Sequence, residues 1–156
     1  DPEPHRNAMV VSAAYLRGTR EGERDGSRWV PDFSRRGRGF AVYAALRSLG
    51  RDGVAEMVER CCAGARRFAE VLGADDAIEI LNDVALNQVL VRFADDDATT
   101  DAVVAAVQAE GTCWMSPTTW RGRRAMRISV CNWATAISDV DRSCEAILGA
   151  AEGRRP

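Results

Sequence analysis

Lysine is absent from this sequence, because all 21 basic residues of the 156-residue chain are arginine. A lysine amine forms Schiff bases with carbonyl compounds, and a lysine also completes the phosphate-binding loop of many nucleotide-binding proteins. The simplest origin of the absence is a coding bias toward arginine codons. Whatever its origin, it excludes both kinds of chemistry for the side chains of this chain.

Histidine is almost absent as well, since His5 is the only one. The five cysteines contain no CxxC pair, and the adjacent Cys61 and Cys62 do not have the spacing of zinc ligands. An odd number of cysteines, most of them on apolar faces of predicted elements, indicates reduced thiols in an intracellular protein. We therefore expect no metal site, no disulfide framework and a cytoplasmic location.

Long apolar runs and a strong excess of charge are also missing. No run approaches the ~20 apolar residues of a transmembrane helix, and the first residues do not resemble a signal peptide. A net charge of -2 gives no general attraction to nucleic acids or anionic membranes, so we expect neither as a partner. The opening Asp-Pro-Glu-Pro resembles the interior of a longer protein, and we expect the chain to be a piece of one.

The residues that are present favour a globular domain, because 46% of them are hydrophobic. Residues 1–33 are irregular, although the apolar residues 9–16 are compatible with a short strand or a helical turn. Residues 17–28 are charged, rich in glycine and without periodicity, which predicts a loop. Two helices should follow. The first begins after Ser34 as N-cap and stops at Gly50, and the second covers residues 52–72.

The second half of the chain has the predicted order β-β-α-β-β-α. Ser116 and Pro117 read as a break, and Thr99 or Thr100 and Ser138 are the predicted N-caps. This order favours an α+β fold in which two helices cover one face of a small sheet. Strands are predicted over residues 77–81, 86–93, 112–115 and 126–130, and helices over residues 99–109 and 138–148.

Two further groups of side chains could be taken for functional sites, but structural roles explain them more simply. Asp95, Asp96 and Asp97 suggest a cation site, yet consecutive carboxylates point in different directions, which favours solvated charge. Trp114 and Trp120 lie beside the Ser-Pro break and are expected to pack on the sheet. Neither group is therefore a candidate site.

Three segments carry a resemblance to a known family: residues 31–39 with 45–50, residues 86–93, and residues 123–132. In this order and with similar gaps they resemble the group II pyridoxal-phosphate-dependent amino-acid decarboxylases. That family includes aromatic-amino-acid, tyrosine, histidine and glutamate decarboxylases. The resemblance implies the type I pyridoxal-phosphate (aminotransferase-like) fold. Residues 1–72 would be a loop and two helices that end the large domain, and residues 73–156 the small C-terminal α+β domain.

The same resemblance implies pyridoxal phosphate as cofactor and an aromatic or related L-amino acid as substrate. The family's cofactor lysine lies before the segment that this chain matches, so the chain alone should not be catalytic. Its expected partner is a second copy in a homodimer or a complementary N-terminal half. The alternative hypothesis is a stand-alone, non-catalytic binding or regulatory module derived from the small domain.

Two candidate substrate-binding residues follow from the resemblance. Arg127 is similar in placement to an arginine that holds the substrate α-carboxylate, a task for which the guanidinium fork is suited. The alternative is a surface arginine paired with an acid. Ser34 is similar to a position that reaches the substrate pocket of the neighbouring subunit, and the alternative is a simple N-cap.

Residues 17–30 resemble the family's mobile catalytic loop, for which Ser27 and Trp29 are the candidates. In several family members this loop carries a tyrosine that protonates the reacting carbon. No tyrosine stands in the loop here, and the indole of Trp29 is not an acid at neutral pH, so packing is its alternative role. The departure leaves open whether the parent enzyme decarboxylates or forms an aldehyde.

Overall fold

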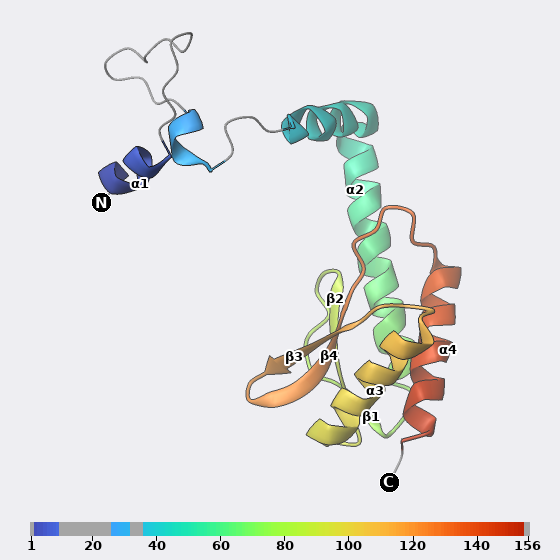
Figure 1. The fold of residues 1–156 in the computed structure, drawn as a ribbon. Coiled ribbons are helices and arrows are strands. Elements are labelled where there is room, and N and C mark those ends of the chain that lie inside the picture. Colours follow the sequence, from blue (N-terminus) through green and yellow to red (C-terminus); the bar gives the residue numbers. More distant parts are fainter. Residues whose placement is uncertain (1, 10–25, 32–35, 155–156) are drawn as a thin grey trace. The chain divides into compact units, whose positions relative to one another are not determined.

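The computed structural model describes residues 2–9, 26–31 and 36–154 (Figure 1). The chain divides into two compact units, residues 1–48 and residues 49–156. No helix in these described ranges combines the length and the apolarity that a membrane crossing needs. The elements of the first unit are α1 (Pro2–Ala8), the 3-10 helix η1 (Gly26–Trp29) and the start of α2 (Arg38–Leu72).

The sequence pattern gave no indication of α1. Pro2 and Pro4 stand in its first turn, where backbone N–H groups have no acceptor within the helix and proline is tolerated. The ring of His5 stacks on Trp29 of η1 with 5.8 Å between ring centroids. Its Nε2 atom also lies 3.2 Å from the carbonyl oxygen of Trp29, which joins the two short helices.

Helix α2 is interrupted at Gly50, whose φ of 64° and ψ of -172° are not helical. Residues other than glycine are strained in this conformation. The predicted stop at Gly50 and the predicted second helix ending at Leu72 are both confirmed. All residues from 38 to 49 are exposed, whereas the second part of α2 buries Ala65, Phe68 and Leu72 in the core.

The second unit is built on an antiparallel four-stranded sheet in the order β1-β2-β4-β3. Strands β3 and β4 form a hairpin whose turn residues Arg121 and Gly122 both have positive φ, as a two-residue loop of type I′ requires. The predicted order β-β-α-β-β-α and the α+β class are confirmed. The elements are β1 (Ile78–Ile80), β2 (Gln88–Phe93), α3 (Asp97–Glu110), β3 (Ser116–Trp120), β4 (Arg123–Ser129) and α4 (Ile137–Glu152).

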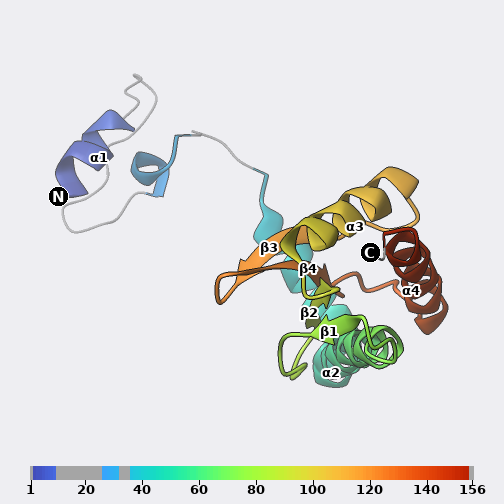
Figure 2. The same cartoon turned by 90° about the horizontal axis from the view of Figure 1, so that it is seen from below.

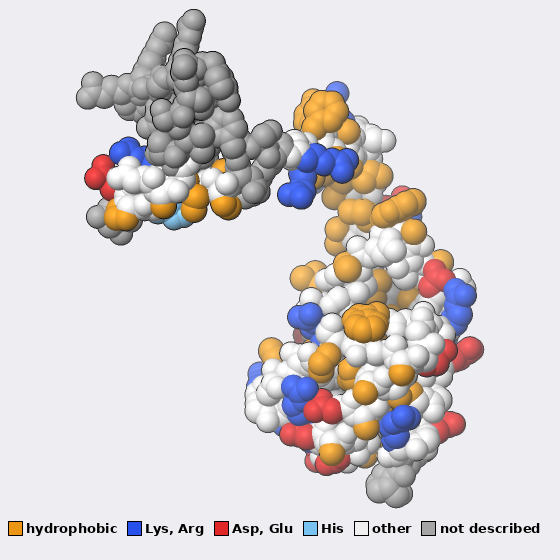
Figure 3. Space-filling view, in the orientation of Figure 1, with side chains coloured by type: hydrophobic (Ala, Val, Ile, Leu, Met, Phe, Trp, Pro, Cys, Tyr) orange, Lys and Arg blue, Asp and Glu red, His pale blue; other side chains and the backbone are white. Residues whose placement is uncertain are grey.

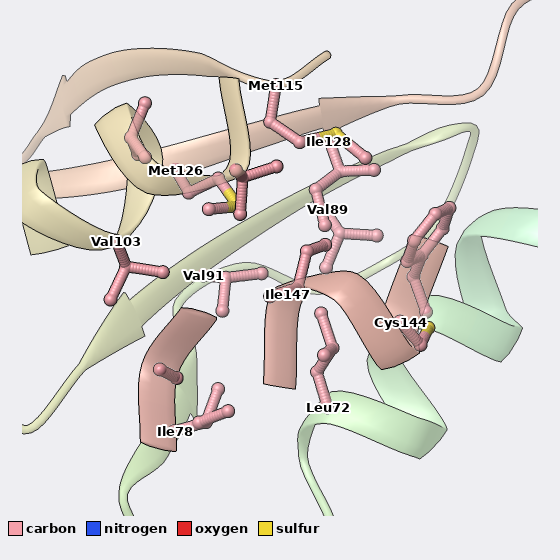
Figure 4. Close-up of a cluster of buried hydrophobic side chains, with 14 of the residues drawn as sticks. Leu72, Ile78, Val89, Val91, Val103, Met115, Met126, Ile128, Cys144 and Ile147 are labelled. Atoms are coloured by element: carbon pink, nitrogen blue, oxygen red, sulfur yellow. The ribbon is translucent and has the colours of Figure 1, made fainter. Parts of the chain in front are cut away.

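One face of the sheet carries the hydrophobic core. The second part of α2 shares this core with α3 and α4, so three helices contribute to it, one more than the sequence predicted (Figure 2). Burial of these apolar side chains is the main stabilising term of the unit. The core side chains labelled in Figure 4 are Leu72, Ile78, Val89, Val91, Val103, Met115, Met126, Ile128, Cys144 and Ile147.

The position of β3 was predicted wrongly. Residues 112–115, the predicted strand, form an irregular connection, and the predicted break at Ser116 and Pro117 is the start of β3. Because β3 is an edge strand, Pro117 can lie in it without removing a hydrogen bond that the sheet needs.

The predicted N-caps of α3 and α4 were also wrong. Asp96 caps α3, and its carboxylate accepts a hydrogen bond of 2.6 Å from the backbone N–H of Thr99. Ala136 is the N-cap of α4, and its N–H donates to the carboxylate of Asp139 at 3.0 Å. In both helices an aspartate carboxylate accepts from a backbone N–H at the N-terminal end, a role that Thr99 or Thr100 was expected to serve in α3 and Ser138 in α4.

Candidate carboxylate-binding site

The face of the sheet opposite the helices is polar. Side chains alternate along a strand, so Leu90 and Arg127, which lie opposite each other on β2 and β4, point away from the core. On the other side of β4, Ser116 of β3 is paired with Arg127. We call this surface the open face, and it consists of Glu79, Gln88, Leu90, Arg92, Ser116, Thr118, Trp120, Arg123, Ala125, Arg127 and Ser129.

Arg92 is the buried cation of the open face, with only 6% of its surface exposed. Its Nε donates to the carboxylate of Asp95 at 3.0 Å, and Nη2 donates to the carbonyl of Asp95 at 3.0 Å. Its Nη1 donates to the carboxylate of Asp97 and, at 2.9 Å, to the carbonyl of Arg124. The hydrogen bond from Arg92 lowers the pKa of Asp97 and keeps that carboxylate charged.

Arg123 and Arg124 are paired as well. Arg123 binds Glu79 and, at 2.7 Å, Asp95. Hydrogen bonds from Arg123 and from Arg92 lower the pKa of Asp95. Arg124 points to the opposite face and binds Asp101 of α3 at 2.7 Å. The three consecutive aspartates are exposed, as the interpretation as solvated charge predicts, but each of them also has a partner within the chain. Two of them bind arginines and the third caps α3.

These carboxylates predict an acid-sensitive fold. The pKa of Asp95 is lowered first by Arg123, and that of Asp97 first by Arg92. A lowered folded-state pKa stabilises the fold above the unfolded pKa, and this contribution is lost as the pH falls through the folded pKa. We expect the urea midpoint to stay level from about pH 7 to 5 and to fall below about pH 4. The Asp95→Asn, Asp97→Asn double variant should flatten that fall. An equally steep fall in the double variant would exclude the two residues as its cause.

Arg127 differs from the other arginines of β2 and β4. It is exposed on a central strand, and no described residue forms a hydrogen bond or an ion pair with its side chain. Its neighbours across the sheet are the uncharged Leu90 and Ser116. A guanidinium stays protonated at any physiological pH, so Arg127 presents an uncompensated positive charge with the fork geometry that fits a carboxylate. The described residues do not supply the acid that its alternative role as one half of a surface ion pair requires.

The other predicted site residues belong to the first unit. Ser34 lies outside the residues that the structure describes. The backbone of Ser27 belongs to η1, and its side chain is not among the described ones. Trp29 stacks on His5, which is a packing contact. Neither unit by itself therefore combines these residues with Arg127.

The expectation that Trp114 and Trp120 pack on the sheet needs correction. Trp114 is 71% exposed and does not pack on the sheet, and Trp120 is partly exposed with the guanidinium of Arg121 at 5.6 Å from its ring centroid. Of the thiols, Cys131 is exposed, whereas burial raises the pKa of Cys144 to about 12. A thiol with so high a pKa is unreactive at neutral pH.

The family model of the pyridoxal-dependent decarboxylase conserved domain matches residues 1–94, which is more than half of the chain. The chain belongs to the pyridoxal-dependent decarboxylase family. The resemblance found in the sequence is thereby confirmed, and pyridoxal phosphate is the cofactor of this family.

Curated relatives agree with this membership. Aromatic-L-amino-acid decarboxylase of Drosophila lebanonensis is 26% identical over 153 residues, which cover 97% of this chain and 38% of that protein. The 3,4-dihydroxyphenylacetaldehyde synthase of Drosophila melanogaster is 26% identical over 144 residues, which cover 90% of this chain and 28% of that protein. Histidine decarboxylase of Rattus norvegicus is 25% identical over 147 residues, covering 94% and 22%. The chain thus spans less than two fifths of the length of these relatives.

Solved structures show the fold. Tryptophan decarboxylase of Catharanthus roseus, in complex with L-tryptophan, gives a TM-score of 0.74 at 20% identity and covers 97% of this chain and 34% of that one. The 4-hydroxyphenylacetaldehyde synthase of Rhodiola rosea gives 0.71 at 22% identity, covering 81% and 28%. The predicted type I pyridoxal-phosphate fold with a small α+β domain is confirmed.

The residues of this pyridoxal-dependent decarboxylase chain do not fit the cofactor as a covalent host. The aldehyde group of pyridoxal phosphate is held by a lysine amine, and the sequence has no lysine. On the open face, the described part of the chain offers one unpaired cation, Arg127, on a central strand. The described side chains therefore offer a cation for an acid group, and the chain has no side-chain amine to anchor the cofactor.

Proposed function

We propose that this chain is the C-terminal portion of a pyridoxal-phosphate-dependent amino-acid decarboxylase, and that it supplies the arginine that binds the substrate carboxylate. Residues 1–72 then complete the large domain and residues 73–156 form the small domain. A lysine-bearing segment holds the cofactor, and the assembly is a homodimer or a complex with a complementary N-terminal half. The substrate is an aromatic or related L-amino acid, in line with the names of the relatives above.

The observation that carries this proposal is the unpaired state of Arg127. Three arginines on the same two strands are bound to carboxylates of the chain itself, and the part of the chain that the structure describes provides no acid for Arg127. A bidentate contact fixes both the position and the plane of a carboxylate. In a decarboxylase the carboxylate is the leaving group, so its orientation decides whether the reaction proceeds. Arg127 would bind and orient this group.

The exposed apolar side chains of α2 support the enzyme over the stand-alone module. Phe40 is 81% exposed, Tyr43 is 64% exposed and Leu46 is 53% exposed, and their spacing places them along one side of the helix. The same region is visible as apolar surface in Figure 3. Apolar surface of this kind marks a contact with another polypeptide segment. A subunit that packs against the rest of an enzyme is expected to present such a surface.

Ser34, Ser27 and Trp29 keep their proposed roles in the assembled enzyme. Ser34 would line the substrate pocket, and Ser27 and Trp29 would belong to the loop that closes over it. Because residues 17–30 contain no tyrosine, aldehyde formation stays an alternative to decarboxylation for the assembled enzyme. Aldehyde formation is also the activity in the name of one relative.

The absorbance of the chain after addition of pyridoxal phosphate tests whether another segment holds the cofactor. We expect the purified chain, mixed with pyridoxal phosphate and dialysed, to retain no chromophore between about 320 and 430 nm, because no side-chain amine is available. A sample with its N-terminal amine acetylated controls for an imine at that amine. A stoichiometric chromophore that survives dialysis in the acetylated sample would show that the chain holds the cofactor itself and would overturn the proposed division.

A further inference from the structure

We infer that the second unit binds a small, uncharged aromatic molecule in a cavity between α2 and two irregular segments, one just before β2 and one just after β4. The cavity has a volume of about 260 Å³. Of the seven described residues that line it, four carry sulfur: Met57, Cys61 and Cys62 of α2, and Cys131 after β4. We call this cavity the sulfur pocket. The inference goes beyond the proposed function and does not depend on the role of Arg127.

One wall of the sulfur pocket is a single side of α2. Met57 and Cys61 are four residues apart, and so are Val58 and Cys62, so that these side chains are neighbours along the helix. The short thiol side chains leave space that longer apolar side chains would fill. Cys62 is only 5% exposed, whereas Val58 is 46% exposed, so the pocket extends from the core to the surface.

The segment around Cys131, on the other side of the pocket, is held by hydrogen bonds. The side chain of Asn87 donates to the carbonyl of Val130 at 3.0 Å, and the N–H of Val130 donates to the carbonyl of Asn87 at 2.9 Å. Further along, Arg60 of α2 donates to the carbonyl of Trp133 at 3.4 Å. The segment is thereby tied both to the residue before β2 and to α2, which keeps the two walls in place.

The lining of the sulfur pocket disfavours a charged ligand. No charged side chain of the described residues lines it, and its one amide, that of Asn87, already donates to Val130. A charged group placed there loses water without gaining an ion partner, which is unfavourable. A dry apolar cavity of ~150 Å³ is large enough to bind benzene. The sulfur pocket, at about 260 Å³, therefore has room for one substituted ring.

Sulfur favours an aromatic ring over a saturated one. The sulfur atoms of methionine and cysteine are polarizable, and contact with a ring adds to the gain from buried apolar area. A cavity lined by leucine, valine and isoleucine makes no such distinction. In the sulfur pocket, Met57 and three thiols surround the space that a ligand would occupy. The chemistry of the lining thus points to an aromatic ligand.

Alkylation of the thiols by iodoacetamide tests the inference on the chain as it is. Cys131 is exposed and Cys61 is partly exposed, so both are open to the reagent until a bound ring covers them. The probes are benzyl alcohol, cyclohexylmethanol and the benzylammonium ion. Cyclohexylmethanol is more apolar than benzyl alcohol, so burial of apolar area alone predicts the opposite preference. The alkylation rate of each cysteine is followed by mass spectrometry of its peptide.

Benzyl alcohol is expected to protect Cys61 and Cys131 saturably, at concentrations about 2- to 10-fold lower than cyclohexylmethanol, the range of a sulfur–aromatic contact. Benzylammonium should not protect them. Cys113, whose pKa is raised by burial and which does not line the pocket, is the internal control and should react at an unchanged rate. Met57→Leu keeps the volume and removes one sulfur, so it should reduce the preference for the aromatic probe.

Val58→Trp should abolish the protection, because the indole fills the pocket from its exposed rim. Val42→Trp adds the same side chain at an exposed position of α2 outside the pocket and is the matched control. Arg127→Met should leave the protection unchanged, which separates this site from the proposed carboxylate-binding residue.

Three results would overturn the inference and leave the proposed function standing. The first is protection by cyclohexylmethanol at equal or lower concentration than benzyl alcohol. The second is protection that Val58→Trp does not change, or no saturable protection by benzyl alcohol. The third is protection that grows with the concentration of the chain in the absence of any probe, which would assign the pocket to a side chain of a second copy.

Discussion

Replacing Arg92 with methionine is expected to lower the free energy of unfolding by about 2–4 kcal/mol, because a buried guanidinium loses four hydrogen bonds. The register between β2 and β4 ends at the pair Val91 and Met126. Beyond this pair, the side chain of Arg92 donates to the backbone carbonyl of Arg124 and links the two strands. Methionine keeps much of the apolar stem and removes every donor, so the loss reports on the hydrogen bonds more than on packing.

Arg127→Met is the matched control, since Arg127 lies on the same face and has no partner among the described residues. Its urea midpoint should equal that of the native chain. Both variants are measured by circular dichroism at pH 7, where Asp95 and Asp97 are charged. Equal losses in the two variants would contradict the assignment of Arg92 as a structural cation.

The network around Arg92 shows why the sequence did not reveal which arginine is free. Arg92, Arg123, Arg124 and Arg127 all stand in predicted strands or beside them, and nothing in their spacing distinguishes them. The distinction arises in the turn after β2, where Ala94 and Asp95 have positive φ values of 51° and 48°. This left-handed turn directs Asp95 back toward Arg92 and Arg123. No glycine marks it, so its conformation could not be predicted from local composition.

Helices and strands with a clear periodic pattern of apolar residues were predicted correctly. Elements whose position depends on pairing with another part of the chain were not. Strands β2 and β4 alternate or are rich in β-branched residues, and the stop at Gly50 follows from its backbone freedom. Strand β3 contains Pro117 and was predicted too early, because its place as an edge strand depends on the hairpin with β4. Local propensity is a weak guide where tertiary pairing decides the structure.

The resemblance indicated Arg127 as the carboxylate-binding residue, and the fold adds the reason why it is available. Alternation places Arg127 opposite the helices, and the register places the uncharged Leu90 and Ser116 on either side of it. The two kinds of information are independent. One comes from the order of motifs along the chain, and the other from which charges are already paired.

In the proposed decarboxylase, assembled with its lysine-bearing segment, Arg127→Met is expected to raise KM about 10- to 100-fold, the cost of a lost charge-assisted contact to the substrate carboxylate. Arg127→Lys should recover part of this loss, because an ammonium keeps the charge but not the two parallel donors. Steady-state kinetics with an aromatic L-amino acid provides the measurement. Arg121→Met, at the exposed tip of the β3–β4 hairpin, is the control and should leave KM unchanged.

The comparison with Arg92 makes this test decisive. If the two arginines have the roles argued above, Arg92→Met lowers stability with little effect on the KM of the folded fraction, and Arg127→Met raises KM at unchanged stability. A KM that stays constant in Arg127→Met would show that the substrate carboxylate is bound elsewhere. The free guanidinium would then serve a contact between polypeptide segments, and the open face would be an assembly surface with no part in substrate binding.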